Sequence, residues 1–481
     1  MDKTEGSAGI YAASQNKTHI IVGDGITALA FLENTAPADL DEIIIIGKRA
    51  SQLGRGAAYA KGEPGTPWRF AYLLNSPADD IDVHFAQWLA GRWQTIATTM
   101  ENRSPNWLAA AAPLVEAGDI YGVNAPREFY GDFMEEKALA RIAKFKTHNV
   151  QVNLIDAEAV SLEVLADGVA LKTAGGETYA ARSADIAPGG PSTLRIEGDY
   201  GPFSVPQLFG NEQRIVDYVK TGGEVFCIGG NASMLDVLRL CQSVLPESEI
   251  KFYACAPDGE IPAPLVPRLP RKFSIPSLSS GHTHAETFLE EVRGEIDLAL
   301  ANGDEMREIR AGFRAHFLEV PLGHYIEDSA EALKVASHLR FWLRGGTRDT
   351  IFDMRRLAKS GQVQVVKGFV TSIQSRTDGA DVVVTDENGK ARTYETGFVV
   401  NCAGAGPNSR FDPLTENLLG QGLIERAAAG GGLKVGDRCQ TGAPHVRYLS
   451  PAVTVIGAET TAMPLYDAHM LRTYVERAKA V

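Results

Sequence analysis

The sequence contains few cysteines, and none of them form a closely spaced pair. Five occur in 481 residues: Cys227, Cys241, Cys255, Cys402 and Cys439. No two are separated by the short spacing of a CxxC or CxxxxC motif. Scattered thiols of this kind indicate buried or incidental residues in a reducing compartment, so we expect a cytoplasmic protein. The spacing also argues against the CxxxxC dithiol on which flavin disulfide reductases depend.

Long apolar runs and an excess of basic residues are missing too. The longest apolar runs, such as residues 43–46, have the length of a strand rather than of a membrane span. The first 18 residues are polar and predict no signal peptide. Acidic residues outnumber basic ones by 60 to 47, a net charge of −13. We therefore expect neither a membrane nor a nucleic acid as partner.

Metal-binding patterns are also absent. His316, His324 and His338 show no HxxxH or HExxH spacing, so we expect surface or core histidines and no metal site. Asp79, Asp80, Asp82 and His84 form a denser cluster. It could do acid–base work, with His84 as a catalytic candidate, or bind a metal. The simpler alternative is a set of carboxylates at the N-terminus of the helix that follows.

A glycine turn near the N-terminus is the most informative feature that is present. Residues 19–28 read HIIVGDGITA, an apolar strand that runs into a GxGxxA turn and a helix. Gly23 permits the sharp turn, Gly25 permits close approach of a pyrophosphate, and small Ala28 permits helix–strand packing. Thr27 lies in the same turn. The phosphates of a dinucleotide would bind at this helix N-terminus, although such glycine pairs also occur in plain βα turns.

The next strand departs from the usual pattern of dinucleotide-binding folds. Residues 41–47 (DEIIIIG) predict a buried parallel strand. Such a strand normally ends in an acidic residue that binds the adenosine ribose. Gly47, Lys48 and Arg49 stand there instead. The ribose is therefore held differently, with Lys48 as a candidate, or it is bound more loosely.

Two loops follow, LGRGAAY at residues 53–59 and LLNSPA at residues 73–78. They lie just beyond the first βαβ unit, where the phosphates and ring of a flavin would be placed. Arg55 could pair with a phosphate, or it could be an exposed loop arginine.

An internal repeat favours dinucleotide binding. Residues 150–190 predict a strand, a hairpin meander and a strand that ends in small residues, and residues 363–404 repeat this plan. Between the repeats, residues 224–236 form a second strand, glycine turn and helix, with Asn231 in place of a glycine. Arg268, Arg271 and Lys272 come shortly after the following strand, which favours NADPH slightly and leaves NADH open.

Two further segments complete the chain. Residues 287–343 show helical spacing of apolar residues and predict an insertion that covers the nucleotide domain and shapes a substrate pocket. Residues 452–459 predict a strand that returns to the first domain, followed by a terminal helix. This return would place Gly457 near the flavin ring, with Tyr466 and Asp467 as catalytic candidates.

Four motifs together resemble a bacterial family of FAD/NAD(P)-binding flavoproteins. These are the two loops above, GGNASMLDV at residues 229–237 and VVNCAGAG at residues 399–406. The family belongs to the superfamily with two dinucleotide-binding domains, which includes flavin-dependent, N-hydroxylating monooxygenases. The resemblance implies contacts to FAD from Gly23, Gly25, Ala28, Arg55, Asn75 and Pro77. It implies contacts to the nicotinamide dinucleotide from Gly229, Asn231 and Ser233, and Gly404 of the last motif is a further candidate.

The predicted fold class is α/β, with two nested Rossmann-like dinucleotide-binding domains, β-meanders and a helical insertion. We expect a FAD-binding domain in residues 1–205 and 351–481, and an NAD(P)-binding domain with the helical insertion in residues 206–350.

Our leading functional hypothesis is a FAD-dependent, NAD(P)H-consuming monooxygenase. It would use O2 to oxidise the nitrogen of a small amine or hydroxylamine through a flavin C4a-(hydro)peroxide, by analogy with the related enzymes. The alternatives are an NAD(P)H-dependent reductase that passes electrons to another acceptor and a non-catalytic nucleotide-binding flavoprotein. The partners would be a small-molecule substrate and O2, with a second copy of the chain or a redox protein as further candidates.

Overall fold

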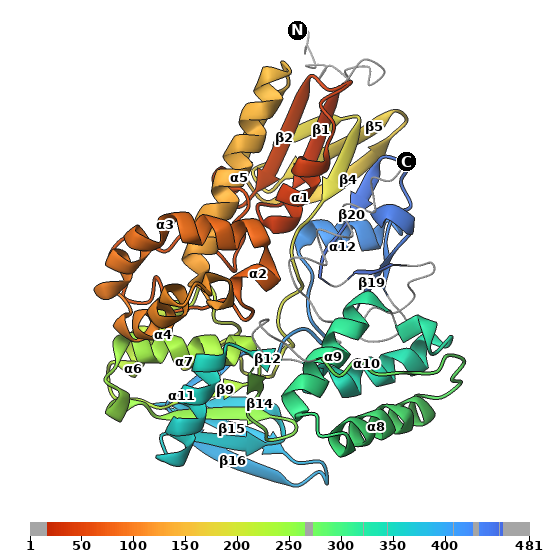
Figure 1. The fold of residues 1–481 in the computed structure, drawn as a ribbon. Helices are drawn as coiled ribbons and strands as arrows, with labels where there is room; N and C mark the ends of the chain where they lie inside the picture. The colour runs from red at the N-terminus through yellow and green to blue at the C-terminus, as the bar shows by residue number, and fades with distance from the viewer. Residues whose placement is uncertain are drawn as a thin grey trace.

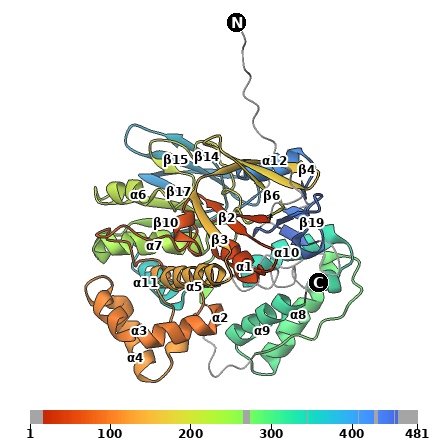
Figure 2. The ribbon, with the colours of Figure 1, turned by 90° about the horizontal axis from the view of Figure 1, so that it is seen from above.

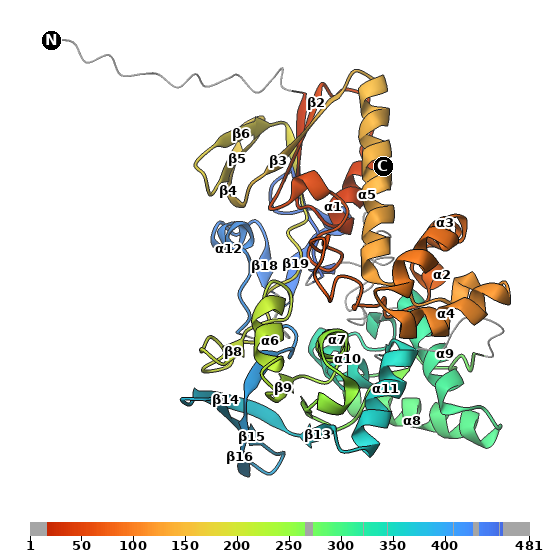
Figure 3. The same cartoon turned by 90° about the vertical axis from the view of Figure 1, so that its left-hand side faces the viewer.

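The computed structural model describes residues 17–264, 273–320, 322–343, 345–406, 408–426, 432–451 and 453–455. Two five-stranded parallel sheets form the framework, the first in the upper half of Figure 1 and the second in the lower half. Both meanders lie on one side of the molecule, and α3, α4, α8 and α9 lie on the other (Figures 2 and 3).

The first sheet has the strand order β20-β7-β1-β2-β3, and every neighbouring pair is parallel. Its strands are β1 (Thr18–Val22), β2 (Glu42–Gly47), β3 (Gln151–Asp156), β7 (Ser183–Ile186) and β20 (Val446–Tyr448). Helix α1 (Ile26–Asn34) follows β1 and buries six consecutive residues, from Thr27 to Leu32. Continuous apolar strands such as IIII in β2 fit a sheet that is covered on both faces.

The second sheet repeats this plan with the order β13-β10-β9-β17-β8, again parallel throughout. Its strands are β8 (Ser204–Val205), β9 (Val225–Ile228), β10 (Phe252–Ala256), β13 (Val363–Lys367) and β17 (Phe398–Asn401). In each sheet a central strand pairs with the next strand on one side and with a strand from beyond the meander on the other. The expected repeat is thus present as two matching sheets.

A three-stranded antiparallel meander accompanies each sheet. The strands of the first are β4 (Ala159–Leu165), β5 (Gly168–Thr173) and β6 (Thr178–Ala181), and those of the second are β14 (Phe369–Ser375), β15 (Ala380–Thr385) and β16 (Ala391–Thr396). Helix α12 (Pro413–Gly420) lies beside β4, where the side chain of Asn417 accepts a hydrogen bond from the amide of Leu162 at 3.0 Å. Helices α6 (Glu212–Val219), α7 (Ala232–Val244) and α11 (Arg348–Lys359) pack into the core of the second sheet.

The strand pairing differs from the expected segment boundaries in two places. Strands β13 and β17 join the second sheet, so that sheet takes residues from both sides of position 350. The chain returns to the first sheet at β20 rather than at residues 452–459. Within that range, β21 (Val453–Val455) pairs instead with β19 (Leu433–Val435), which also pairs with β18 (Glu425–Arg426). The short sequence of β20 carries a central arginine, and its apolar pattern is too brief to predict a buried strand.

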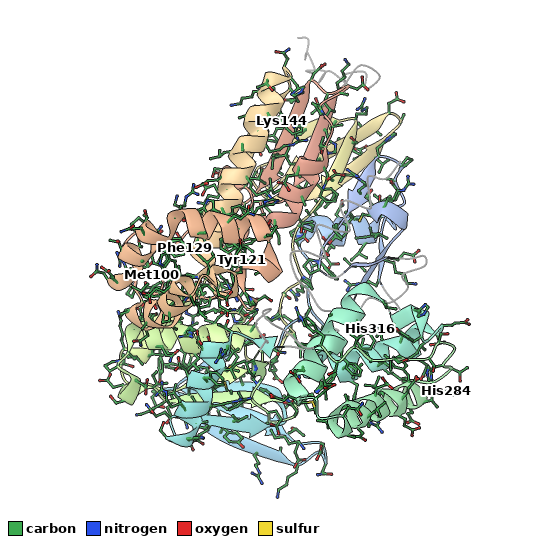
Figure 4. The ribbon with its side chains drawn as sticks, viewed as in Figure 1. Met100, Tyr121, Phe129, Lys144, His284 and His316 are labelled. Atoms are coloured by element: carbon green, nitrogen blue, oxygen red, sulfur yellow. The ribbon has the colours of Figure 1, made fainter. Side chains whose placement is uncertain are left out.

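The expected helical insertion is present in the part of the chain that connects β10 to β13. It consists of α8 (Ala285–Ala301), α9 (Met306–Glu319) and α10 (Ser329–Leu343), and these helices share a core of their own. Residues 263–264 and 345–346 form the short pair β11 (Ala263–Pro264) and β12 (Gly345–Gly346) near its two ends. Figure 4 shows His316 and His284 on this insertion, at separate positions.

The part of the chain that connects β2 to β3 forms a second helical layer. Its helices are α2 (Ala78–Ile81), α3 (Val83–Glu101), α4 (Pro105–Glu116) and the long α5 (Arg127–Thr147). Figure 4 places Met100, Tyr121 and Phe129 in this layer, whereas Lys144 lies towards the far end of α5. Met100 and Phe129 are buried in the same core as α1, so this layer is continuous with the first sheet.

Candidate functional site

The two predicted glycine turns have the same backbone geometry. Gly23 has a φ of +119°, and a Cβ there would lie 2.1 Å from the carbonyl oxygen of Ala187, directly after β7. Gly229 has a φ of +105°, and a Cβ there would lie 2.4 Å from the carbonyl oxygen of Cys402, directly after β17. Only glycine satisfies both the positive φ and the close backbone approach. Each turn is therefore built by the same contact between neighbouring parallel strands.

Both turns lead into helix N-termini that the described side chains leave uncapped. The N-cap residue of α1 is Gly25 and that of α7 is Asn231, and neither helix has a side-chain cap. The first backbone bonds within the helices run from Leu29 to Gly25 and from Leu235 to Asn231. The preceding N–H groups and the positive end of each helix dipole fit a phosphate or pyrophosphate. The candidate ligands Thr27, Ala28 and Ser233 lie in these first turns.

The LGRG loop packs directly on the first turn. The amides of Gly54 and Gly56 both donate to the carbonyl oxygen of Asp24, at 2.9 and 3.1 Å. Gly56 has a φ of +57°, and a Cβ there would lie 3.0 Å from the Cα of Gly25. This glycine loop therefore packs against the turn, and its expected position beside a flavin stays a prediction.

Arg55 of this loop does not face the turn. Its side chain is only 1% exposed, and its guanidinium pairs with Asp132 and Glu135 of α5. The Nε atom donates to Glu135 at 2.8 Å. A Cβ on Gly131 would lie 2.4 Å from this guanidinium, so the glycine makes room for it. The expected pairing with a phosphate is replaced here by a buried structural ion pair, whose partners lie some 80 residues along the chain.

Lys48 also points elsewhere. Its amine lies 2.9 Å from Glu158 at the start of the first meander, and its side chain is 69% exposed. The neighbouring Gly47 is tightly packed, because a Cβ there would lie 3.0 Å from the Cβ of Asp24. The expected role of Lys48 at the ribose therefore gains no support from this geometry.

The LLNSPA loop lies at the junction between the two sheets. The carbonyl oxygen of Leu74 accepts hydrogen bonds from Asn124 and from Thr347, each at 3.0 Å. Thr347 directly precedes α11 of the second unit, so the loop is held from both sides. Asn75 is half-buried, and Pro77 is buried where α2 begins. Both proposed flavin contacts are thus held on a fixed loop.

The remaining predicted site residues are scattered. His84 is exposed on α3. Its amide donates to the side chain of Asp82 at 2.9 Å, so Asp82 caps the helix, as the simpler alternative for these carboxylates expected. Gly404 is exposed, with a φ of +80°, and its carbonyl oxygen accepts from the amide of Leu194 at 2.6 Å. Gly457, Tyr466 and Asp467 lie outside the residues that the structure describes.

A buried ion pair at the junction was not predicted. Arg127, at the start of α5, lies 2.9 Å from Asp236 of α7, and the two side chains are 11% and 6% exposed. The Nε atom of Arg127 also donates to the carbonyl oxygen of Leu73 at 3.1 Å. Burial raises the pKa of Asp236 to about 6, against the opposing effect of Arg127. The sequence did contain one sign of this ion pair, because Asp236 lies among apolar residues of the helix that follows the second glycine turn.

Tyr72 lies beside this ion pair with a buried hydroxyl that makes no hydrogen bond among the described residues. Burial raises the pKa of Tyr72 well above its ordinary value, and Glu212 and Asp236 add to the effect. An unsatisfied buried hydroxyl destabilises the fold, so Tyr72→Phe should raise the free energy of unfolding by up to about 1 kcal/mol. Chemical denaturation with urea measures this change. A loss of stability would show that the hydroxyl has a partner in solution.

A second buried polar cluster crosses the first sheet. His19 lies 2.8 Å from Ser183 and 3.1 Å from Asp185, and both carboxylate oxygens of Asp185 accept from Arg447. Burial alone would raise the pKa of Asp185, but His19 and Arg447 outweigh it and the pKa lies below its ordinary value. The set contains serine, histidine and aspartate, but Arg447 holds the aspartate and the side chains lie within the sheet. We interpret the cluster as structural.

Two other features, a metal centre and a membrane-spanning helix, are absent from the described part of the chain. No group of three or more histidine, cysteine, aspartate or glutamate side chains there could hold a metal ion. None of the helices in these ranges combines the length and the apolar character that a membrane crossing requires.

Comparison with known proteins gives a family match that includes the first glycine turn and ends before the second. Residues 20–191 match the model of a family described as FAD-NAD(P)-binding. No curated protein matches the chain. Among solved structures, the FAD-bound cadaverine monooxygenase of desferrioxamine biosynthesis from Erwinia amylovora is similar, with a TM-score of 0.53 and 12% identity over 96% of this chain and 94% of that one.

Two further solved structures have similar coverage. The ornithine hydroxylase of Pseudomonas aeruginosa has a TM-score of 0.51 and 13% identity, over 96% of this chain and 97% of that one. The thioredoxin reductase of T. acidophilum has a TM-score of 0.45 and 12% identity, over 95% of this chain and 98% of that one. The first two likenesses show the fold, two dinucleotide-binding units with meanders.

Proposed function

We propose that this chain, whose residues 20–191 match a family described as FAD-NAD(P)-binding, is a FAD-dependent, NAD(P)H-consuming monooxygenase of a small amine or hydroxylamine. The repeated glycine turn is the observation that carries the proposal. A second turn with the geometry of the first gives the chain a second phosphate-binding helix N-terminus, at α7. A flavin alone would need only one of the two.

Each unit has a distinct part in this proposal. Gly23, Gly25 and the first turn of α1 bind the pyrophosphate of FAD, and the loop with Asn75 and Pro77 borders the ring. Gly229, Asn231 and Ser233 bind the pyrophosphate of NADPH or NADH. A flavin bound by these residues would supply the redox chemistry, which is hydride acceptance from the nicotinamide and electron transfer to O2. The protein then has to orient the partners and exclude water.

The cysteines support oxygen chemistry over disulfide reduction. All five are free and buried. Burial raises the pKa of the Cys241, Cys255 and Cys439 thiols to about 12, and it raises that of Cys227 as well. Dithiol exchange requires an accessible thiolate, and all five thiols are buried away from a disulfide substrate. A reductase with an external acceptor remains the second candidate, since it needs no thiol of its own.

The substrate class rests on two of the structural neighbours, a cadaverine monooxygenase and an ornithine hydroxylase. Both names denote oxidation of amines. A small amine is therefore the first substrate to test, with O2 as the second, and with a second copy of the chain or a redox protein as further partners.

Anaerobic reduction followed by exposure to oxygen tests the proposal. We expect NADPH or NADH to bleach the flavin absorbance of the purified protein, and O2 to restore it. With a suitable amine, mass spectrometry should then detect a product heavier by one oxygen atom, labelled when 18O2 is used. Reoxidation that yields only hydrogen peroxide with every amine in a panel would favour the reductase. Absence of bleaching with both nucleotides would contradict either enzyme.

A further inference from the structure

The missing acidic residue after β2 has a structural counterpart within the first turn. In dinucleotide-binding folds the acid at the end of the second strand accepts hydrogen bonds from the adenosine ribose. Here Gly47 ends β2, and a Cβ on it would lie 3.0 Å from the Cβ of Asp24. The Asp24 side chain thus occupies the space beside the end of β2.

In the second unit the corresponding two positions also face each other, but there the side chain is on the strand and the glycine is in the turn. Gly23 donates its amide to the last residue but one of β2, Ile46, and Gly229 donates to the corresponding residue of β10. By this register Gly230 corresponds to Asp24, and Ala256 corresponds to Gly47. A Cβ on Gly230 would lie 2.7 Å from the Cβ of Ala256. At each turn, therefore, only one of the two facing positions carries a side chain.

The carboxylate of Asp24 is held over the end of β2. Its Oδ2 atom accepts a hydrogen bond from the amide of Arg49 at 2.8 Å, just beyond the strand. The amides of Gly54 and Gly56 fix its backbone by donating to its carbonyl oxygen. The side chain is half-buried, and an ionised carboxylate has further acceptor positions besides the one that Arg49 uses.

We infer that Asp24 replaces the missing acid and binds the adenosine ribose hydroxyls of FAD. The inference rests on the proposed function, because it requires FAD at the first turn. The ribose diol donates two hydrogen bonds, and a carboxylate accepts them more strongly than a neutral group does. Asp24 would thereby select a dinucleotide flavin whose adenosine ribose is intact.

Binding of FAD and of its 2′,3′-dideoxyadenosine analogue to the apoprotein tests this assignment. We expect the wild-type protein to bind FAD about tenfold or more tightly than the analogue, the effect of a lost charge-assisted hydrogen bond. Asp24→Ala should bind both ligands with the weaker affinity. Asp24→Asn serves as the folding control, because its amide oxygen can still accept from the amide of Arg49. Titration by flavin fluorescence gives these dissociation constants without any turnover.

An exchange of the two facing positions provides an independent check. Gly47→Glu alone should lower the Tm and weaken FAD binding, since the new Cβ overlaps Asp24. The double variant Asp24→Gly/Gly47→Glu reproduces the arrangement in which the acid follows β2, and it should recover part of the lost Tm and the preference for FAD over the analogue. The φ of Gly47 is not positive, so a side chain there causes no backbone strain of its own. The new Cβ would still lie 3.0 Å from the carbonyl carbon of Gly23 and 3.1 Å from the amide nitrogen of residue 24, so the turn has to shift slightly to accept it.

The results of these titrations distinguish a failure of the Asp24 assignment from a failure of the proposed function. Equal binding of FAD by the wild type and by Asp24→Ala would overturn the ribose assignment alone. Tighter binding by Asp24→Ala would also overturn it, and would show that the carboxylate repels the phosphates. Failure of the wild-type protein to bind FAD at all would overturn the proposed function together with the inference.

Discussion

Replacing Arg127 by methionine should lower the free energy of unfolding by about 3–5 kcal/mol, the range for a buried charge that loses its partner. The variant removes the charge partner of Asp236 in a site where the Asp236 side chain is 6% exposed, so the carboxyl must either stay charged while buried or take up a proton. It also removes the hydrogen bond to the carbonyl oxygen of Leu73, on the loop that carries Asn75. Urea denaturation monitored by tryptophan fluorescence measures the change.

The double variant Arg127→Met/Asp236→Leu is the matched control. Because it removes both charges and fills the site with apolar groups, it should recover most of the stability that Arg127→Met loses. Equal losses in the single and double variants would show that the cost arises from packing rather than from the unpaired carboxylate.

The pH dependence provides a second measurement on the same pair. The pKa of Asp236 is about 6 in the folded protein, above the ordinary value of 3.8 expected for the unfolded chain. Between these values the folded state binds more protons than the unfolded state, so this group makes stability fall as pH rises from about 4 to about 6. Above that window its contribution is constant. The difference in stability between the wild type and Asp236→Asn should change across this window and level off beyond it.

Local sequence patterns account for the parts of the fold that could be predicted. The glycine turns, the meanders and the helical insertion all depend on residues within a short segment, such as the apolar strand that leads into Gly23. The repeat then indicated two similar units. The buried strand β20 was missed because three residues with Arg447 at the centre carry no apolar pattern. That arginine belongs in the sheet only because Asp185 lies on the neighbouring strand.

Side-chain partners that lie far along the chain could not be predicted. Arg55 has the position of a phosphate ligand, but Asp132 and Glu135 on a helix some 80 residues away engage it. Arg127 and Asp236 meet only because the two units pack together. In each case the sequence shows the charge, and its role depends on which opposite charge the tertiary fold brings near.

Alanine at the two turn glycines should separate the two nucleotide sites. In Gly23→Ala the new Cβ would lie 2.1 Å from the carbonyl oxygen of Ala187, at a φ of +119° that alanine rarely adopts. The turn must therefore open, which moves the N-terminus of α1. We expect FAD affinity to fall by about 100-fold or more, since two charge-assisted hydrogen bonds to the pyrophosphate would be lost. Equilibrium titration of the apoprotein measures this loss.

Gly229→Ala makes the same change in the second unit, where the new Cβ would lie 2.4 Å from the carbonyl oxygen of Cys402. It should leave FAD binding within about threefold of the wild type, a difference below 1 kcal/mol, while the rate of flavin reduction falls steeply at a fixed NADPH concentration. Gly65→Ala is the matched control, because Gly65 also has a positive φ, +93°, but nothing lies within 4 Å of its Cβ position. It should show only the cost of backbone strain, about 1–2 kcal/mol of stability, and normal binding of both nucleotides. If Gly229→Ala instead lost FAD and kept its reduction by NADPH, the assignment of the two turns would have to be reversed.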